Sequence, residues 1–379
     1  MKFQNAHLAY CTNIHPAETW EETWHALKTH TLKVRDSLQA APYAIGLRLS
    51  QQAASELLQG DKLTQFKHWL DQENCYVFTI NGFPYGAFHG TRVKEKVYQP
   101  DWTTQERLQY TNDLFTIIAQ LVPEGMDGSV STLPGSFKEF NADETLIFKN
   151  LEACAQHIET LSQQYNRDLH LGLEPEPLGH FENTTETLAF FERFLKQTND
   201  PERIKRRIGI NYDTCHFALE FDDCHQSLDA FRNAGLRISK VHLSSALEFD
   251  PSSPEALEKI QAFDEPTYLH QVIIQDSNGT IIRFKDLPEF MASMEKAKSN
   301  IKHPALGRIH FHIPLYAEPD FPLSSTNAHA KAALDYIKKN PNFCTHFEIE
   351  TYTWSVLPKN FQVSIIQQIN KEYRWALKQ

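Results

Sequence analysis

An alternating apolar pattern that stops on two acids is found at Leu169-His170-Leu171-Gly172-Leu173-Glu174-Pro175-Glu176-Pro177. The alternation indicates a buried strand, and the first proline marks its end. Three later segments, at residues 208–216, 238–243 and 346–351, repeat the arrangement and carry a carboxylate or a histidine near their ends. Strands that alternate with helices and present polar groups at their C-terminal ends predict a (β/α) barrel with one functional mouth.

The length of 379 residues exceeds the roughly 250 that one such barrel needs. We therefore expect a single α/β domain, 1–379, in which a (β/α)8 TIM barrel carries an insertion at about 247–320, between its seventh and eighth strands. A β-hairpin is expected inside the insertion, because residues 276–279 read Asp-Ser-Asn-Gly between two apolar runs. The amphipathic segment at about 360–377 predicts a C-terminal helix.

The sequence offers nine strand candidates for eight barrel positions. We place the run 308–314 outside the barrel because it belongs to the insertion; the alternative is that the run 129–133 is irregular. The stretch 81–90 is rich in glycine and aromatic residues and follows a strand directly. Its position favours a wall over the mouth of the barrel, and a floor packed under its own rings is the alternative.

The composition argues against several classes of protein. A net charge of -11 argues against a general nucleic-acid binder, because such binding depends on clustered lysine and arginine. The six cysteines form no C-x-x-C pair, so we expect reduced thiols. The first residues lack an apolar signal region, and no run reaches the roughly 18 apolar residues of a membrane helix. We expect a cytoplasmic protein without membrane insertion, of undetermined oligomeric state.

Four side chains near successive strand ends form the strongest candidate site: Glu174, Asp213, His242 and Glu350. Three carboxylates and one imidazole suit a divalent metal, with Mn²⁺, Mg²⁺ or Fe²⁺ favoured and Zn²⁺ as a further option. Such a metal can bind two neighbouring oxygens of a sugar and polarise a carbonyl, so that an adjacent C–H proton becomes removable. The flanking carboxylates would transfer that proton. The alternative role for these acids is ordinary ion pairing, but an acid inside an apolar strand is costly unless it is paired or liganded.

The same residues carry a resemblance to a known superfamily. Four short motifs resemble the metal ligands at the strand ends of the xylose isomerase-like barrels, which form the sugar phosphate isomerase/epimerase superfamily. They are Leu173-Glu174-Pro175, Asp213-Thr214-Cys215-His216, Val241-His242-Leu243 and Ile349-Glu350-Thr351. A narrower resemblance, to the EboE-type metabolite traffic proteins of bacterial ebo operons, covers nearly the whole chain. It rests on residues 10–16, 83–90, 131–138, 310–314 and 350–354.

The resemblance implies roles for individual residues. Glu174 and Glu350 match metal ligands that also transfer protons, Asp213 and His242 match the other two ligands, and His216 matches a substrate-contacting histidine. It implies a metal-dependent isomerase or epimerase that acts on a small polyhydroxylated carbonyl compound, such as a sugar or sugar phosphate. The narrower resemblance implies a place in the processing or traffic of secondary-metabolite precursors.

Some residues depart from the pattern of the simple epimerases. Glu176 and Glu348 each lie two residues from a ligand acid, so they share its strand face and could compete for the metal. His310 and His312 also share a face and could add a ligand, which leaves a second metal open. We expect His216, His310, His312 and Glu176 to contact the substrate.

Two further residues are weaker candidates for substrate contacts. Arg48 could bind a phosphate or carboxylate of the ligand, or could be a structural partner of an acid, and His89 lies in the expected wall. Two other functions also remain open from the sequence. One is a metal-dependent hydrolase or oxygenase on the same barrel, and the other is a non-catalytic protein that binds a metabolite and helps in its traffic.

Overall fold

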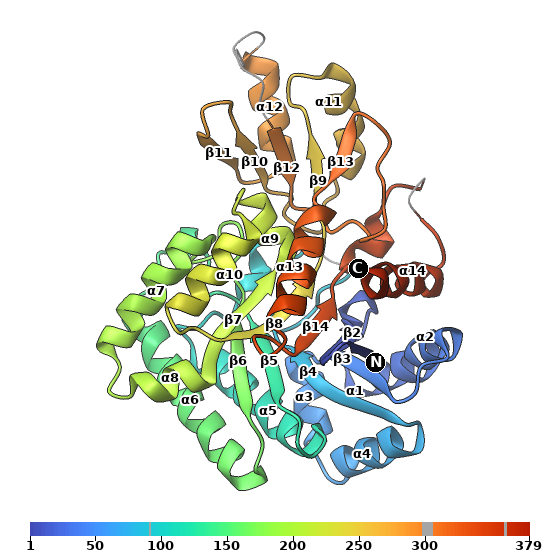
Figure 1. Cartoon of the computed structure of the whole chain (residues 1–379), viewed down its shortest axis with the longest axis vertical. Helices are drawn as coiled ribbons and strands as arrows, with labels where there is room; N and C mark the ends of the chain where they lie inside the picture. The colour runs from blue at the N-terminus through green and yellow to red at the C-terminus, as the bar shows by residue number, and fades with distance from the viewer. Residues whose placement is uncertain (91, 298–305, 360–361) are drawn as a thin grey trace.

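The computed structural model describes residues 1–90, 92–297, 306–359 and 362–379 (Figure 1). Its centre is a (β/α)8 barrel, as the sequence predicts. The apolar residues of the barrel strands are buried, which explains the short apolar runs in the sequence. The parallel strands are β2 (Ala6–Tyr10), β3 (Tyr43–Arg48), β4 (Cys75–Asn81), β5 (Gly128–Thr132), β6 (Leu169–Leu173), β7 (Ile208–Asp213), β8 (Ile238–Leu243) and β14 (His346–Ile349).

The strands follow one another around the barrel. The sheet has nine strands in the order β1-β2-β14-β8-β7-β6-β5-β4-β3, and its neighbours are parallel except for β1 (Lys2–Phe3), which pairs antiparallel with β2. A parallel bridge between Cys11 and Gly46 joins the end of β2 to β3. This bridge brings the two edges of the sheet together, so the strand ends of β6, β7, β8 and β14 face one mouth.

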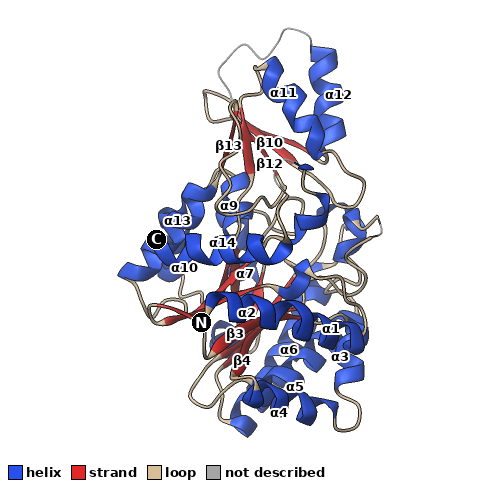
Figure 2. Cartoon of the chain, turned by 90° about the vertical axis from the view of Figure 1, so that its right-hand side faces the viewer, coloured by secondary structure: helices blue, strands red, loops and turns tan. Residues whose placement is uncertain are grey.

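Helices surround the barrel in both views (Figures 1 and 2). Their apolar faces pack on the outer face of the strands, as expected for crossover helices of a parallel sheet. They are α1 (Trp20–Ala26), α2 (Leu32–Leu38), α3 (Gln51–Leu57), α4 (Lys62–Gln72), α5 (Gln105–Leu121), α6 (Glu144–Tyr165), α7 (Thr184–Gln197), α8 (Pro201–Arg207), α9 (Thr214–Leu219), α10 (Cys224–Asn233), α13 (Asn327–Lys339) and α14 (Ile365–Lys378). Short one-turn or π-helical segments are η1 (Thr12–Ile14), η2 (Leu27–Thr31), η3 (Lys94–Tyr98), η4 (Lys138–Phe140) and η6 (Tyr352–Val356).

The chain between β8 and β14 forms a second, five-stranded antiparallel sheet, with the order β11-β10-β12-β9-β13. It lies at the top of Figure 1, beyond one end of the barrel. It has its own apolar cluster, which includes Phe249, Val272 and Phe290. Its elements are β9 (Leu247–Phe249), α11 (Pro254–Ile260), η5 (Gln261–Phe263), β10 (Val272–Gln275), β11 (Ile281–Phe284), α12 (Leu287–Ala297), β12 (Leu306–Ile309) and β13 (Leu323–Ser325).

The second sheet accounts for the surplus strand candidate. The run 308–314 contributes to β12, outside the barrel, whereas the run 129–133 is regular and forms most of β5. The expected hairpin is also present: β10 and β11 pair antiparallel, and Gly279 occupies the turn with a φ of 80°. Residues 298–305 of the expected insertion and residues 360 and 361 of the expected C-terminal helix lie outside the described residues.

Two further features concern the whole chain. All six cysteines are free, which agrees with the expectation of reduced thiols. In the four described ranges, no helix combines the length and the apolar character that crossing a bilayer requires.

Candidate metal centre

Four buried side chains meet at the mouth of the barrel. Glu174 and Glu350 follow β6 and β14, Asp213 ends β7, and His242 lies in β8. The backbone N–H of Glu174 donates to Thr132 O (2.9 Å) and that of Glu350 to Leu243 O (3.0 Å), so both glutamates stay in the ladder one residue beyond their strands. Each of the four residues offers a ligand atom within 4.8 Å of the others, and their exposed fractions lie between 0 and 6%.

The Nδ1 atom of His242 lies at the centre of this group. It is 3.1 Å from Glu174 Oε1, 3.3 Å from Glu350 Oε2 and 3.7 Å from Asp213 Oδ2. Three carboxylate oxygens therefore surround one imidazole nitrogen, and the sequence correctly predicted that these four residues come together.

The second oxygen of each glutamate is held by amide donors. Asn211 Nδ2 donates to Glu174 Oε2 at 2.8 Å. Asn13 Nδ2 and Asn81 Nδ2 both donate to Glu350 Oε1, each at 2.9 Å. These bonds fix the rotation of the carboxylates, which directs Glu174 Oε1 and Glu350 Oε2 toward the central nitrogen.

The Asp213 carboxylate is fixed in the same way. Asp213 is the N-cap residue of α9, and its Oδ1 accepts from the backbone N–H groups of Cys215 (2.7 Å) and His216 (3.0 Å). Ser244 Oγ donates to the same oxygen at 2.6 Å. The other oxygen, Asp213 Oδ2, is buried and makes no hydrogen bond within the described residues. A buried carboxylate oxygen without a donor is costly, and a cation would remove that cost.

Glu348 lies behind His242. Its Oε2 accepts from His242 Nε2 at 2.9 Å and from Lys240 Nζ at 2.6 Å. The Nε2–H bond leaves Nδ1 of His242 as the atom that faces the carboxylates, which is the arrangement of a metal-bound histidine with an outer carboxylate. The expectation that Glu348 competes for the metal is therefore wrong, because its carboxylate contacts the opposite ring nitrogen.

The crowding of acids shifts their ionisation. Burial opposes a charge on His242, but the carboxylates of Glu350 and Glu174 raise its pKa well above the ordinary value. Burial likewise works against the charge of Glu350, yet the neighbouring His242 holds its pKa well below the usual range. For Glu176, burial and then the charge of Glu174 raise the pKa well above the usual value. The mouth is therefore a region in which negative charge accumulates.

The donor set fits a divalent cation. It offers Glu174 Oε1, Asp213 Oδ2, Glu350 Oε2 and His242 Nδ1, that is, three hard oxygens and one imidazole nitrogen. The unpartnered Asp213 Oδ2 points to the same conclusion from geometry. Mn²⁺, Mg²⁺, Fe²⁺ and Zn²⁺ all accept such ligands, so the geometry does not select among them.

A pocket opens beside this group, with a volume of about 70 Å³. By the same measure, one water molecule needs about 10–15 Å³, so the pocket can hold several waters or part of a small ligand. Two of the ligand acids, Glu174 and Glu350, reach its surface. The remaining lining residues are Phe83, Pro84, Phe88, Val93, Lys94, Val97, Tyr98, Glu176, His216, Tyr268, Leu269, Gln271, His310 and Tyr352.

Two segments form an apolar wall around the pocket. The loop after β4 contributes Phe88, and the segment of the insertion just before β10 contributes Tyr268. The Tyr268 OH donates to Phe88 O at 3.1 Å. Val93 N donates to Thr267 O at 2.9 Å. The rings of Phe88, Tyr268 and Tyr352 pack with centroids 5.0–5.3 Å apart. The stretch 81–90 is thus part of a wall, which was the favoured alternative.

The structure separates the expected substrate contacts into two sets. His216, His310 and Glu176 line the pocket, and His312 lies directly behind them, with His310 Nε2 at 3.3 Å from His312 Nε2. Arg48 does not line the pocket: its guanidinium contacts Ala17 O, Gly86 O and Glu18.

His89 is also outside the pocket lining. It makes hydrogen bonds with Asn13 O (2.5 Å) and Tyr268 OH (3.0 Å), so it connects the first strand-to-helix turn with the wall. Arg48 and His89 therefore hold the loops of the mouth in place, and substrate contact by either residue remains a prediction.

Several residues that contact the four acids and histidine were not predicted from the sequence, among them Asn81, Asn211 and Lys240. Their positions contained a usable signal. Asn81 ends β4, and Asn211 and Lys240 each lie two residues before a ligand, on the same face of the strand. Polar residues at inward-facing strand positions need partners, so an inspection of those positions would have identified all three.

No protein-family model and no curated protein sequence matches this chain. Similar solved structures include the IolI protein with a bound zinc atom, which aligns with a TM-score of 0.51 and 11% identity over 98% of each chain. L-ribulose 3-epimerase aligns with a TM-score of 0.51 and 10% identity over 98% of this chain and 95% of its own. A D-tagatose 3-epimerase-like protein gives 0.50 and 11% over 98% and 97%. The shared feature is the fold, a (β/α)8 barrel.

Proposed function

We propose that this protein is a divalent-metal-dependent isomerase or epimerase that acts on a small polyhydroxylated carbonyl compound, a sugar or sugar phosphate. The observation that carries the proposal is the group of Glu174, Asp213, His242 and Glu350, whose ligand atoms lie within 4.8 Å of one another beside a pocket. The fold shared with sugar epimerases is in accord with this reading. A bound cation would polarise a carbonyl and lower the barrier to removing the neighbouring C–H proton.

The chain's own residues would move the proton. Glu174 and Glu350 both reach the pocket surface, so one carboxylate can take a proton from the substrate and the other can return it. Asn211 holds Glu174, and Asn13 and Asn81 hold Glu350, which keeps both carboxylates in fixed orientations. The apolar wall around Phe88 would exclude water from the reacting atoms.

Contacts to the substrate are proposed for His216 and Glu176, which line the pocket beside the two glutamates. The resemblance to EboE-type proteins leads us to propose a place in the processing or traffic of secondary-metabolite precursors. The free, buried cysteines support action in the cytoplasm.

The test is proton exchange. Metal-loaded protein is incubated in deuterated water with a panel of ketoses, aldoses and their phosphates, and exchange and isomer formation are followed by NMR. Wild type should exchange a substrate C–H proton, and Glu174→Gln and Glu350→Gln should lose at least about 100-fold in rate, as expected for the loss of a general acid or base. Full activity in either variant would contradict the two-carboxylate mechanism. Tight ligand binding without exchange would favour the binding and traffic function instead.

A further inference from the structure

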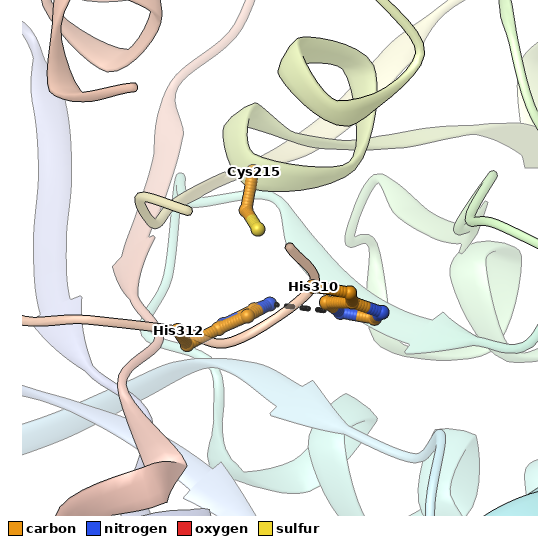
Figure 3. Close-up of side chains that lie close together, drawn as sticks. All are labelled: Cys215, His310 and His312. Carbon is orange, nitrogen blue, oxygen red and sulfur yellow. Dashed lines mark hydrogen bonds between the residues drawn. The ribbon is translucent and has the colours of Figure 1, made fainter. Parts of the chain in front are cut away.

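A second group of potential ligands lies beside the candidate metal centre. Cys215, His310 and His312 offer ligand atoms that all lie within 4.8 Å of one another. Figure 3 shows the sulfur of Cys215 directed toward the two imidazoles, which face each other. The three side chains come from different parts of the fold, namely the start of α9 and the segment that follows β12.

Three neighbouring imidazoles have their Nδ1 atoms committed as donors. His216 Nδ1 lies 3.1 Å from Pro175 O, and His312 Nδ1 lies 2.9 Å from Glu350 O. A carbonyl oxygen only accepts, so in each pair the proton is on Nδ1. His310 Nδ1 lies 2.7 Å from Gln271 Oε1.

The orientation of the Gln271 amide is itself fixed. Its Nε2 donates to Pro177 O at 3.2 Å, which leaves Oε1 as the acceptor for His310. An imidazole that carries a single proton, on Nδ1, has a bare Nε2 atom, and this form of the three rings leaves three bare Nε2 atoms. His310 Nε2 is nevertheless only 3.1 Å from His216 Nε2 and 3.3 Å from His312 Nε2. Lone pairs at such distances repel, so a positive species is needed between the rings.

We propose that His310 Nε2, His312 Nε2 and Cys215 Sγ bind a second divalent cation of the zinc class. Ring nitrogens whose other N–H donates to an oxygen are the usual form of metal-bound histidine. A sulfur and two imidazoles are softer donors than the carboxylates of the first site, which favours Zn²⁺ over Mg²⁺ or Mn²⁺.

Glu176 supports the charge balance of this second site. Glu176, His216 and His310 also offer ligand atoms within 4.8 Å of one another, and Glu176 Oε1 is buried without a hydrogen bond in the described residues. A thiolate and one nearby carboxylate would neutralise a doubly charged cation. The site uses none of the four ligands of the first centre, so it does not rest on the proposed function.

Metal analysis of the zinc-loaded, gel-filtered full chain tests the proposal. We expect two zinc ions per wild-type chain, one in His310→Ala and one in His242→Ala. His170→Ala is the matched control, because His170 is an equally buried histidine away from the pocket, and it should keep two. If wild type binds one zinc ion, and this ion is kept in His310→Ala but lost in His242→Ala, the second site is overturned and the first is not. If wild type binds one zinc ion, and this ion is lost in His310→Ala but kept in His242→Ala, the second site is supported and the first centre is contradicted. No zinc in wild type would overturn both.

Cobalt provides a readout that does not need the histidine variant to fold. Wild type loaded with Co²⁺ should show thiolate-to-cobalt charge-transfer absorption in the near ultraviolet. Cys215→Ser should lose this absorption, and Cys154→Ser should keep it, since Cys154 is an equally buried thiol in α6. Absence of the band in wild type, or its survival in Cys215→Ser, would mean that the imidazoles share only a proton and would overturn the proposal.

Discussion

The two ends of the barrel carry the same kinds of side chain with different partners. At the mouth, Asp213 and His242 meet two glutamates. At the opposite end, Asp127, His170 and His346 also offer ligand atoms within 4.8 Å of one another. Residue type alone would therefore suggest a metal site at either end.

The partners of the carboxylates separate the two ends. Asp127 lies 3.4 Å from Arg237 Nη2, accepts from Thr345 Oγ1 at 3.1 Å, and contacts both histidines at 3.2–3.3 Å. At the mouth, no lysine or arginine of the described residues lies within 4.0 Å of the acids Glu174, Glu176, Asp213 and Glu350. An acid that already has an arginine needs no metal, whereas uncompensated buried acids do.

The largest expected effect is on metal affinity at the mouth. His242→Ala removes the central nitrogen and should lower the metal affinity of the first site by more than about 100-fold. This loss exceeds the roughly 10–100-fold that follows when a residue hydrogen-bonded to a metal ligand is removed. Chelator competition with Mn²⁺ measures it. His346→Ala, at the other end, should leave Mn²⁺ affinity unchanged. Equal losses in both variants would break the distinction between the two ends.

Next in size is the effect of the outer carboxylate. Glu348→Gln should weaken metal binding by about 10–100-fold, because the amide orients His242 Nδ1 less well and leaves the buried Lys240 without its charge partner. The same competition assay measures the change. Unchanged affinity with unchanged stability would show that Glu348 does not position the histidine.

At the opposite end, the expected effect is on stability. Asp127→Asn removes a charged acceptor from Arg237 and the two histidines, and should lower the free energy of unfolding by about 2 kcal/mol. Urea denaturation at neutral pH measures this change. Metal content should stay at the wild-type value. A loss of bound metal in Asp127→Asn would show that a metal binds at the end of the barrel opposite the mouth, which would contradict the distinction between the two ends.

The smallest effect concerns a buried acid just outside the mouth, Glu372. It accepts from Thr351 Oγ1 at 2.6 Å and Leu315 N at 3.2 Å, and burial raises its pKa to about 7. Because the folded-state pKa is raised, the stability this group contributes is complete below pH 4.5 and decreases as the pH rises to about 7.

Glu372→Gln should therefore stabilise the protein by about 1–2 kcal/mol at pH 8 and change little at pH 4. Thermal unfolding at the two pH values measures the difference. Equal effects at both pH values would show that burial does not raise the pKa of the Glu372 carboxyl. This acid, without a cation, shows what the acids of the mouth would cost if no metal bound there.

The sequence predicted which four side chains meet at the mouth better than it predicted their surroundings. Glu174, Asp213, His242 and Glu350 were found because each ends or interrupts an apolar strand, which is a local signal. The role of Glu348 was misjudged because strand periodicity gives the face of a residue and not its partner. Whether Glu348 contacts the metal or the far side of His242 depends on Lys240, which is more than a hundred positions away in the chain.

The barrel and the hairpin were predicted for the same local reason, since alternation and an Asn-Gly turn are short-range features. The second sheet was not predicted. It depends on pairing between segments far apart in the sequence, such as β9 with β12 and β13. Arg48 was a candidate for ligand binding because the sequence shows its charge. The sequence does not show its partners, the carbonyl oxygens of Ala17 and Gly86, because the conformations of the loops bring them to the guanidinium.

Anomalous diffraction from crystals grown with zinc tests the central claim most directly. The account predicts a peak within coordination distance of Glu174 Oε1, Asp213 Oδ2, His242 Nδ1 and Glu350 Oε2, at the mouth of the barrel. No peak at these atoms, or a peak between Asp127, His170 and His346 instead, would contradict it.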